Sequence, residues 1–439
     1  MLKSYRRMTL KILASKSFYS LSISITGNIL ISVFGFITSI LVLRRADTEN
    51  IALIYPLLGI LMITEQLSDL GLSNSLIQVA ASLWNTYPAK ALNLCNMILK
   101  IRGLLTILVV TLGVFLSKWI SLLIFKTPDH SYWVKITILI CIVSLLNNFH
   151  INFLQITSQF KKQFVIRVLP HLSKMLLLLF CFYTHQLNFN FLFFGFFLVP
   201  FFSFALSILV SDFPYLRNPG GFTLEVTETL HLSKWILIST LCVSFMGQID
   251  LFMLRSLSSP EELARYMGGS RLASVFMILN SSLVAVLLPK VSAYQTKHEL
   301  RAYFLRSLKL LPIILVLTLI AFILAPAFIH LTLSQKYDTS IPVFRTFFIQ
   351  FGIDLFITPI SLILYKLHKA HLFSILNFIQ LFLFSLMNFL LIPSLGAQGV
   401  ALSGLSIRVF ALFFILWIFK KNYLNAMSWH SPNHSSRAE

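Results

Sequence analysis

Long apolar stretches dominate the chain, and polar residues gather in the short segments between them. Each stretch is about 20 residues or longer, the length a helix needs to cross a bilayer. None alternates apolar and polar residues with the period of two that is typical of a membrane β-barrel. The pattern therefore predicts twelve transmembrane helices, near residues 18–43, 52–80, 92–117, 133–156, 164–184, 189–211, 234–254, 264–289, 302–331, 341–366, 371–393 and 398–420.

The longest connection divides these helices into two sets of six. It covers residues 212–233 and contains Pro214, Pro219, Gly220 and Gly221. The sequence thus predicts an all-α polytopic membrane protein. Its expected parts are a basic N-terminal segment at 1–17, a first six-helix bundle at 18–211, a linker at 212–233, a second bundle at 234–421 and a tail at 422–439.

Composition agrees with a membrane setting, since 57% of the residues are hydrophobic and 11% are charged, against about 25% charged in soluble proteins. The net charge of +20 reflects topology rather than nucleic-acid binding, because the basic residues collect on one side. With the N-terminus in the cytoplasm, about nineteen Lys and Arg residues face inward and about seven face outward. Both termini are therefore expected in the cytoplasm, and the protein in the inner (cytoplasmic) membrane.

The two predicted halves share a spaced pattern of polar residues. Arg44 is followed eleven residues later by Tyr55, and Arg255 eleven residues later by Tyr266. Fourteen residues after each tyrosine stands Asp69 in one half and Asn280 in the other. Internal repeats of this kind are common in secondary transporters, whose substrate site lies at the repeat interface.

Three segments resemble signatures of oligosaccharide flippases. They are residues 69–74 (DLGLSN), residues 248–250 (QID) continuing through 257–262 (LSSPEE) to Tyr266 and Arg271, and residues 391–401 (LIPSLGAQGVA). Their order and spacing make the chain similar to Wzx-type polysaccharide flippases of the multidrug/oligosaccharidyl-lipid/polysaccharide exporter superfamily. The corresponding turn of the first half, at 186–190, lacks the Pro-x-x-Gly pattern.

This resemblance implies two pseudo-symmetric six-helix bundles around a central cavity that opens to either side of the membrane in turn. It implies a polyprenyl-diphosphate-linked oligosaccharide as cargo, moved to the outer leaflet for surface polysaccharide such as O-antigen or lipopolysaccharide. Membrane lipid, a coupling H⁺ or Na⁺ and a polysaccharide polymerase are the candidate partners. The resemblance also makes an arginine in the eighth helix, here Arg271, a candidate functional residue.

Ionisable residues inside the predicted spans are the candidate site, because they usually line a protein interior or a wet cavity. In the fifth helix Arg167, His171 and Lys174 fall on one face. They are interpreted either as a basic stripe that binds a diphosphate or as long side chains that extend back to the lipid headgroups. Lys100 and Arg102 of the third helix are further candidates. Glu65 lies at a similar depth, so an ion pair with Arg102 is as plausible as a ligand contact.

The second half contributes two possible acid–base pairs. Asp250 and Arg271 lie at comparable depth on adjacent helices, either as a fixed pair or as one that exchanges carboxylate for diphosphate. Asp354 and Arg408 lie near the middle of the membrane, where Asp354 is a proton-coupling residue or the partner of the arginine. Arg345 lies nearer the outer surface, as a further coupling or gating candidate.

Asp69 is expected to make a structural or gating contact, since Glu65, Asp69 and Ser73 form a polar line at i, i+4 and i+8. The basic set outnumbers the acidic set within the spans, which favours an anionic cargo over a cationic drug. The candidate substrate-binding set is therefore Arg271, Arg408, Arg167, His171, Lys174, Lys100 and Arg102, and the candidate coupling or gating set is Asp250, Asp354, Asp69, Glu65 and Arg345.

The sequence shows no Walker motif, metal-ligand cluster or nucleophile elbow, so neither a cofactor nor enzyme activity is expected. The four cysteines stand singly in apolar segments and are expected to be buried thiols. Two alternatives to the flippase remain open. One is a cation-coupled multidrug exporter of the same superfamily, with an acidic cavity, and the other is a membrane polymerase or ligase of glycans, for which the outer loops are short.

Overall fold

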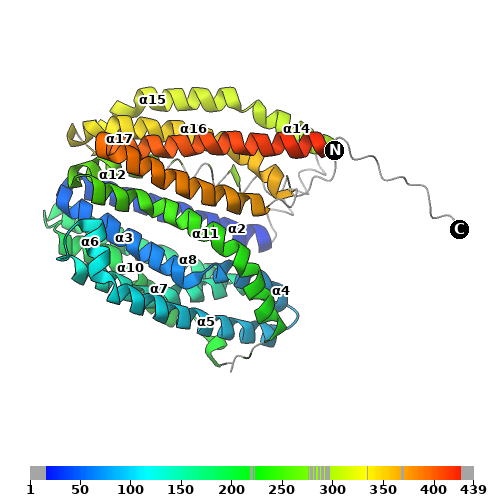
Figure 1. Ribbon diagram of the computed structural model, residues 1–439. Coiled ribbons are helices and arrows are strands. Elements are labelled where there is room, and N and C mark those ends of the chain that lie inside the picture. Colours follow the sequence, from blue (N-terminus) through cyan, green and yellow to red (C-terminus); the bar gives the residue numbers. More distant parts are fainter. Residues whose placement is uncertain are drawn as a thin grey trace.

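The computed structural model describes residues 16–217, 221, 223–274, 276, 280, 283–284, 287, 291, 297–333, 335–366 and 370–426. All regular structure in these residues is helical, which confirms the predicted all-α class (Figure 1). Ten of the described helical segments are long and apolar enough to cross a membrane. The count of twelve is not confirmed, because the eighth predicted span lies partly outside the described residues and the last two run together in one helix. Residues 1–15 and 427–439 of the expected terminal segments also lie outside them.

The first bundle begins and ends its helices at recognisable local signals. Pro88 opens α5, where its missing N–H is no loss. Asn188 caps α9 by accepting a hydrogen bond from the amide of Phe191 at 3.1 Å, and Lys126 ends α6 in the left-handed conformation (φ 64°). The helices are α2 (Lys16–Arg45), α3 (Thr48–Asp69), α4 (Leu72–Trp84), α5 (Pro88–Phe115), α6 (Ser117–Phe125), α7 (Ser131–Ile156), α8 (Phe160–Tyr183), α9 (Phe189–Phe197) and α10 (Val199–Val210).

The second bundle lies beside the first, with α2, α11 and α12 between the outer helices of the two (Figure 1). Pro260 and two glutamates form the first turn of α12, where negative charge stabilises the amino end of a helix. The elements are α11 (Leu224–Leu257), α12 (Pro260–Ser274), α14 (Lys297–Leu308), α15 (Leu311–Leu333), the short η2 (Gln335–Ser340), α16 (Ile341–Lys366) and α17 (Ala370–Ala426).

A glycine turns the long helix α17 back on itself. Gly396 has φ 52° and ψ −127°, a conformation that side chains disfavour. The carboxylate of Glu262 in α12 accepts a hydrogen bond from the amide of Ala397 at 2.8 Å. A Cβ on Gly396 would overlap that carboxylate. Two of the recognised sequence motifs, 257–262 and 391–401, therefore meet at one turn.

Among the described residues, the largest apolar core is shared by the two bundles and lies toward one end of the molecule. The largest cluster of buried side chains contains residues of both bundles, among them Tyr55, Phe197, Leu254 and Phe344. At the other end a separate cluster around Leu76 and Leu94 lies in the first bundle with the start of α11, and another around Ile360 and Ile415 lies in the second. The bundles are thus joined at the end that carries the α2–α3, α6–α7, α11–α12 and α15–α16 connections. The four cysteines are buried free thiols, as predicted.

The segment between the bundles is held against the first one. The short helix η1 (Pro214–Arg217) places Tyr215 among the buried side chains of the first bundle. Its carbonyl accepts from Asn96 Nδ2 at 2.8 Å, and its hydroxyl lies 3.2 Å from His150 Nδ1. α11 begins at Leu224, within the expected linker, and packs against α3 and α4 as well as α17. It belongs to the second bundle by sequence but contacts both.

Candidate functional site

The second predicted span is two helices rather than one. α3 ends at Asp69, Leu70 and Gly71 both have positive φ (46° and 74°), and α4 begins at Leu72. The side chain of Asp69 bridges the break, because its Oδ1 accepts a hydrogen bond from Ser73 Oγ at 2.5 Å. The expected i, i+4 contact between Asp69 and Ser73 is therefore present, although the helix between them is interrupted.

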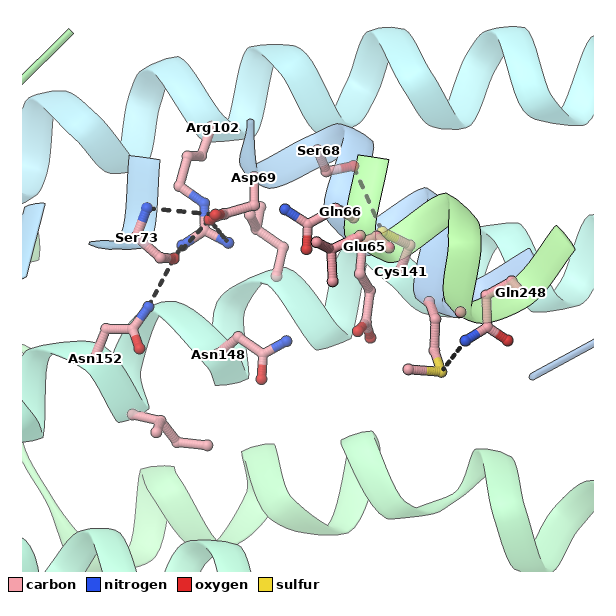
Figure 2. A pocket seen from close by; sticks show the side chains of 16 residues that line it. Glu65, Gln66, Ser68, Asp69, Ser73, Arg102, Cys141, Asn148, Asn152 and Gln248 are labelled. Carbon is pink, nitrogen blue, oxygen red and sulfur yellow. Dashed lines mark hydrogen bonds and ion pairs between the residues drawn. The ribbon is translucent and has the colours of Figure 1, made fainter. Parts of the chain in front are cut away.

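Arg102 forms the centre of a polar cluster at this break (Figure 2). Its Nη2 lies 3.0 Å from Asp69 Oδ1, and its Nη1 donates to Ser73 Oγ at 3.0 Å. Asn152 Nδ2 donates to the same hydroxyl at 2.8 Å. Arg102 is 3% exposed, and its guanidinium also lies over the ring of Phe149, 5.8 Å from the centroid. The ion pair thus joins Arg102 to Asp69, not to Glu65 as the depths along the helices suggested.

This cluster borders a cavity of about 500 Å³ between the first bundle and α11. Its side chains come from α3, α4, α5 and α7 on one side and from α11 on the other (Figure 2). Glu65, Asp69 and Arg102 carry its charges, so two carboxylates face one guanidinium rather than the expected basic excess. The other polar lining residues are Gln66, Ser68, Ser73, Asn148, Asn152, Ser244 and Gln248.

The helix-five stripe divides between two places. Arg167 and His171 line a smaller cavity of about 210 Å³ inside the first bundle. Arg167 Nη2 donates there to Asn28 Oδ1 at 3.0 Å. Glu65 and Asn148 line this cavity and the larger one, so they form part of the wall between them. Lys174 lines neither of these two cavities. Its ammonium lies over the ring of Phe196, 4.9 Å from the centroid.

Arg271 lies where α12 meets the first bundle. Its guanidinium stacks on the ring of Tyr55 in α3, 4.8 Å from the centroid. Its Nε is buried without a hydrogen-bond partner among the described residues, and its charge acts on that of Lys174. The expected ion pair with Asp250 is not present in this part of the chain, because Asp250 instead accepts hydrogen bonds from the Tyr266 hydroxyl and from the amide of Leu251 at 2.7 Å.

Two of the remaining candidates, Arg408 and Arg345, lie in the second bundle, and the third, Lys100, lies on the surface of the first. Arg408 Nε lies 3.0 Å from Asp354 Oδ1, as one of the two interpretations of that pair expected. Arg345 Nε donates to the carbonyl of Phe322 at 3.1 Å, and its guanidinium lies over the ring of that residue. Lys100 is exposed on α5 and does not line either cavity.

Sequence reasoning missed the neutral half of the larger cavity. Ser244, Gly247 and Gln248 stand on one face of α11, and Gln248 Nε2 donates to Met62 Sδ of α3 at 3.4 Å. Their spacing of three and four residues was a usable signal, because residues so spaced share one face of a helix. The repeat pattern contains Tyr55 but does not indicate its contact, which is that its ring lies under the guanidinium of Arg271.

A family model described as "Polysaccharide biosynthesis protein" matches residues 51–342. No curated protein sequence matches the chain. Among solved structures, a multidrug resistance MATE family transporter of the MOP superfamily in an inward-facing conformation is similar with a TM-score of 0.71 and 15% identity, over 91% of this chain and 96% of that one.

Two further solved structures share the fold. The lipid II flippase MurJ in an inward closed conformation has a TM-score of 0.69 and 12% identity, over 94% of each chain. A MOP superfamily transporter from Pyrococcus furiosus, described by a reversed polarity of its binding pocket, has a TM-score of 0.64 and 12% identity, over 93% of this chain and 95% of that one. The chain therefore has the fold of MOP-superfamily transporters.

Proposed function

The chain belongs to the polysaccharide biosynthesis protein family, and from this membership we propose that it moves a polyprenyl-diphosphate-linked oligosaccharide from the inner to the outer leaflet of the cytoplasmic membrane. The movement proceeds by alternating access, with both termini in the cytoplasm. Its product serves a surface polysaccharide such as O-antigen. The multi-pass helical fold and its likeness to membrane transporters support this proposal.

The observation that carries the proposal is the pair Arg271 and Lys174. Both cations rest on aromatic rings, Tyr55 and Phe196, and neither forms an ion pair within the described residues. Two positive charges that act on each other and have no ion-pair partner among the described residues are unfavourable in a low-dielectric interior. A diphosphate would neutralise both, and the guanidinium fork of Arg271 suits two phosphate oxygens.

The other basic residues divide by their partners. Arg102 and Arg408 each form an ion pair with a carboxylate 3.0 Å away. In our proposal they bind the cargo only after the anion has displaced that carboxylate. Arg167 and His171 line the smaller cavity, and in our proposal they attract the headgroup before it reaches Arg271. Lys100, exposed on α5, adds to the positive field at the surface.

Coupling is assigned to the carboxylates. Asp354, paired with Arg408, and Asp250, bound to the hydroxyl of Tyr266, can each gain H⁺ or Na⁺ when its partner moves. Glu65 faces both cavities, so its charge state bears on each. Asp69 and Arg345 hold the helix break and α16 in place through the contacts described above.

One observation favours a second candidate, a cation-coupled multidrug exporter. The larger cavity presents Glu65 and Asp69 against Arg102, an acidic balance that suits a cationic molecule. The two candidates differ in what accumulates when the protein is removed: a lipid-linked glycan in the first case, and an exported drug in the second.

The test is depletion in the native cell, followed by mass spectrometry of the lipid-linked glycans. We expect one completed polyprenyl-diphosphate oligosaccharide to accumulate on the cytoplasmic side. Wild-type protein and Arg265→Ala should relieve the accumulation, and Arg271→Ala should not, although it is inserted normally. Arg265 is the matched control because it lies on the same helix and, within the described part of the chain, its ion pair is with Glu262 of that helix, at 2.8 Å. Drug sensitivity without accumulation would move the assignment to the exporter.

A further inference from the structure

Two arginines, one from each half of the sequence repeat, extend from their own bundle to the other one. Both lie at the end of the molecule where the apolar cores of the bundles join. Arg44 stands at the end of α2 in the first bundle, and Arg255 near the end of α11. They occupy corresponding positions, since each precedes its repeat tyrosine by eleven residues. The structure shows that both reach toward the other bundle.

Arg44 binds the carboxyl end of α15 in the second bundle. Its Nη2 donates to the carbonyl of Leu331 at 2.5 Å, and its Nε donates to the carbonyl of Thr332. The last four carbonyls of a helix lack partners within the helix and carry its partial negative charge. A guanidinium therefore satisfies two of them and matches their charge. Beside this contact, Lys336 Nζ donates to the carbonyl of Ala46 at 3.5 Å.

Arg255 makes the reciprocal contact with the first bundle. Its guanidinium lies over the ring of Phe125, the last residue of α6, 5.7 Å from the centroid. Glu49 of α3 and Glu261 of α12 attract its charge. Partial burial, and after it the charge of Arg255, hold the pKa of His130 below its ordinary value in the loop that follows α6. Arg44 thus contacts the end of α15, and Arg255 the end of α6, each in the opposite bundle.

Both arginine contacts lie far along the helices from the larger cavity. The cavity-lining residue Met62 comes fourteen residues after the start of α3, roughly 20 Å along that helix from the arginine end. The apolar cores of the two bundles join near the arginines and separate toward the cavity. To open the cavity toward the arginine end, the two contacts have to break.

We propose that Arg44 and Arg255 form a two-point latch that closes the outer side of the protein and stabilises the inward-facing state. This inference rests on the proposed alternating access, but it does not depend on which molecule is carried. The acceptors of Arg44 are backbone carbonyls, so truncating a side chain of α15 does not remove them. The strength of the latch is therefore set by the arginines themselves.

The test measures how often the cavity opens to the latch side, without cargo. A cysteine is placed at Met62, which is 55% exposed, in a Cys141→Ala background because Cys141 also lines the cavity. A membrane-impermeant maleimide is applied to intact cells and, in parallel, to inside-out vesicles. When opening is brief, the labelling rate is proportional to the open fraction, so fold-changes are measurable even for a rare state.

We expect Arg44→Ala and Arg255→Ala each to raise the labelling rate from outside about tenfold, equal to about 1.4 kcal/mol, and the double variant to raise it more than either. The control is Arg45→Ala, since Arg45 neighbours Arg44 but, among the described residues, its side chain contacts His185 and Phe182 of its own bundle. If Arg44→Ala does not reach the membrane, Arg44→Lys replaces it with a smaller expected increase, because lysine keeps the charge but not the paired donors.

An unchanged rate in the arginine variants, or an equal rise in Arg45→Ala, overturns the latch. A third result is possible: the parent protein is labelled rapidly from outside, and the arginine variants change the rate only in inside-out vesicles. That result supports the latch but reverses the proposed membrane orientation. Failure to find a lipid-linked glycan in the depletion experiment leaves these rates unaffected. The latch and the proposed cargo are thus tested separately.

Discussion

Replacing Arg102 with methionine removes one charge from the cluster at the helix break and leaves Asp69 without its partner. Breaking a buried pair in this way costs about 3–5 kcal/mol. The side chain of Asp69 is 16% exposed and borders the cavity, whereas that of Arg102 is 4% exposed. Water can therefore partly solvate the remaining carboxylate, and we expect Arg102→Met to lower the free energy of unfolding by about 2–3 kcal/mol.

The reverse change, Asp69→Asn, should be more damaging. It leaves the guanidinium, the more deeply buried partner, uncompensated, and we expect a loss of about 3–4 kcal/mol. The double variant Asp69→Asn/Arg102→Met leaves no unpaired charge, so its loss should be clearly smaller than the sum of the two. Unfolding by denaturing detergent in micelles gives the three values and the interaction free energy, expected at about 1–3 kcal/mol.

An exposed pair provides the comparison. Lys90 Nζ lies 3.3 Å from Glu225 Oε1, and the lysine side chain is 61% exposed. The same cycle with Lys90→Met and Glu225→Gln should give an interaction below about 1 kcal/mol. If the losses of Asp69→Asn and Arg102→Met simply add, the pair is not a stabilising unit, and the assignment of Arg102 to the helix break is refuted.

Two further predictions follow from the second bundle. Gly396→Ala should lower the thermal stability of the purified protein, because the left-handed φ costs about 1–2 kcal/mol and the new Cβ meets Glu262. Gly35→Ala, with no neighbour within 4 Å, should not lower it, because alanine is favoured over glycine inside a helix. Equal melting temperatures of the two variants would contradict this. Asp354→Asn should abolish any dependence of glycan flipping on a pH gradient in reconstituted vesicles, because the amide cannot take up the proton; retained dependence would remove Asp354 from coupling.

The sequence predicted the helical class well because apolar length alone determines it. It did not predict the break at Leu70 and Gly71, since the apolar pattern continues across these residues. Depth along a helix suggested Glu65 as the partner of Arg102, but Asp69 lies only one turn further and on the same face. The choice between them depends on helix rotation and on the break, which are properties of the packed bundle.

The helix-five stripe shows the same limit. Periodicity placed Arg167, His171 and Lys174 on one face, and the first two do share a cavity. Lys174 lies farther along the helix, where the opposing surface is the ring of Phe196. Which wall a side chain meets depends on the neighbouring helices. The resemblance to flippase motifs was more informative for contacts, since the segments containing Glu262 and Gly396 prove to touch.

The attachment of Tyr215 to the first bundle bears on how the gene could be divided. A chain cut at residue 211, where the apolar pattern places the boundary, would give a first fragment without the tyrosine that fills its core and bonds to Asn96. A cut after residue 221 would keep that side chain and the contact of Gly221 with Asn93. Of the two divisions, the cut after residue 221 leaves the first fragment with Tyr215 in its core. We expect the two fragments of that division, expressed separately, to reassemble in the membrane.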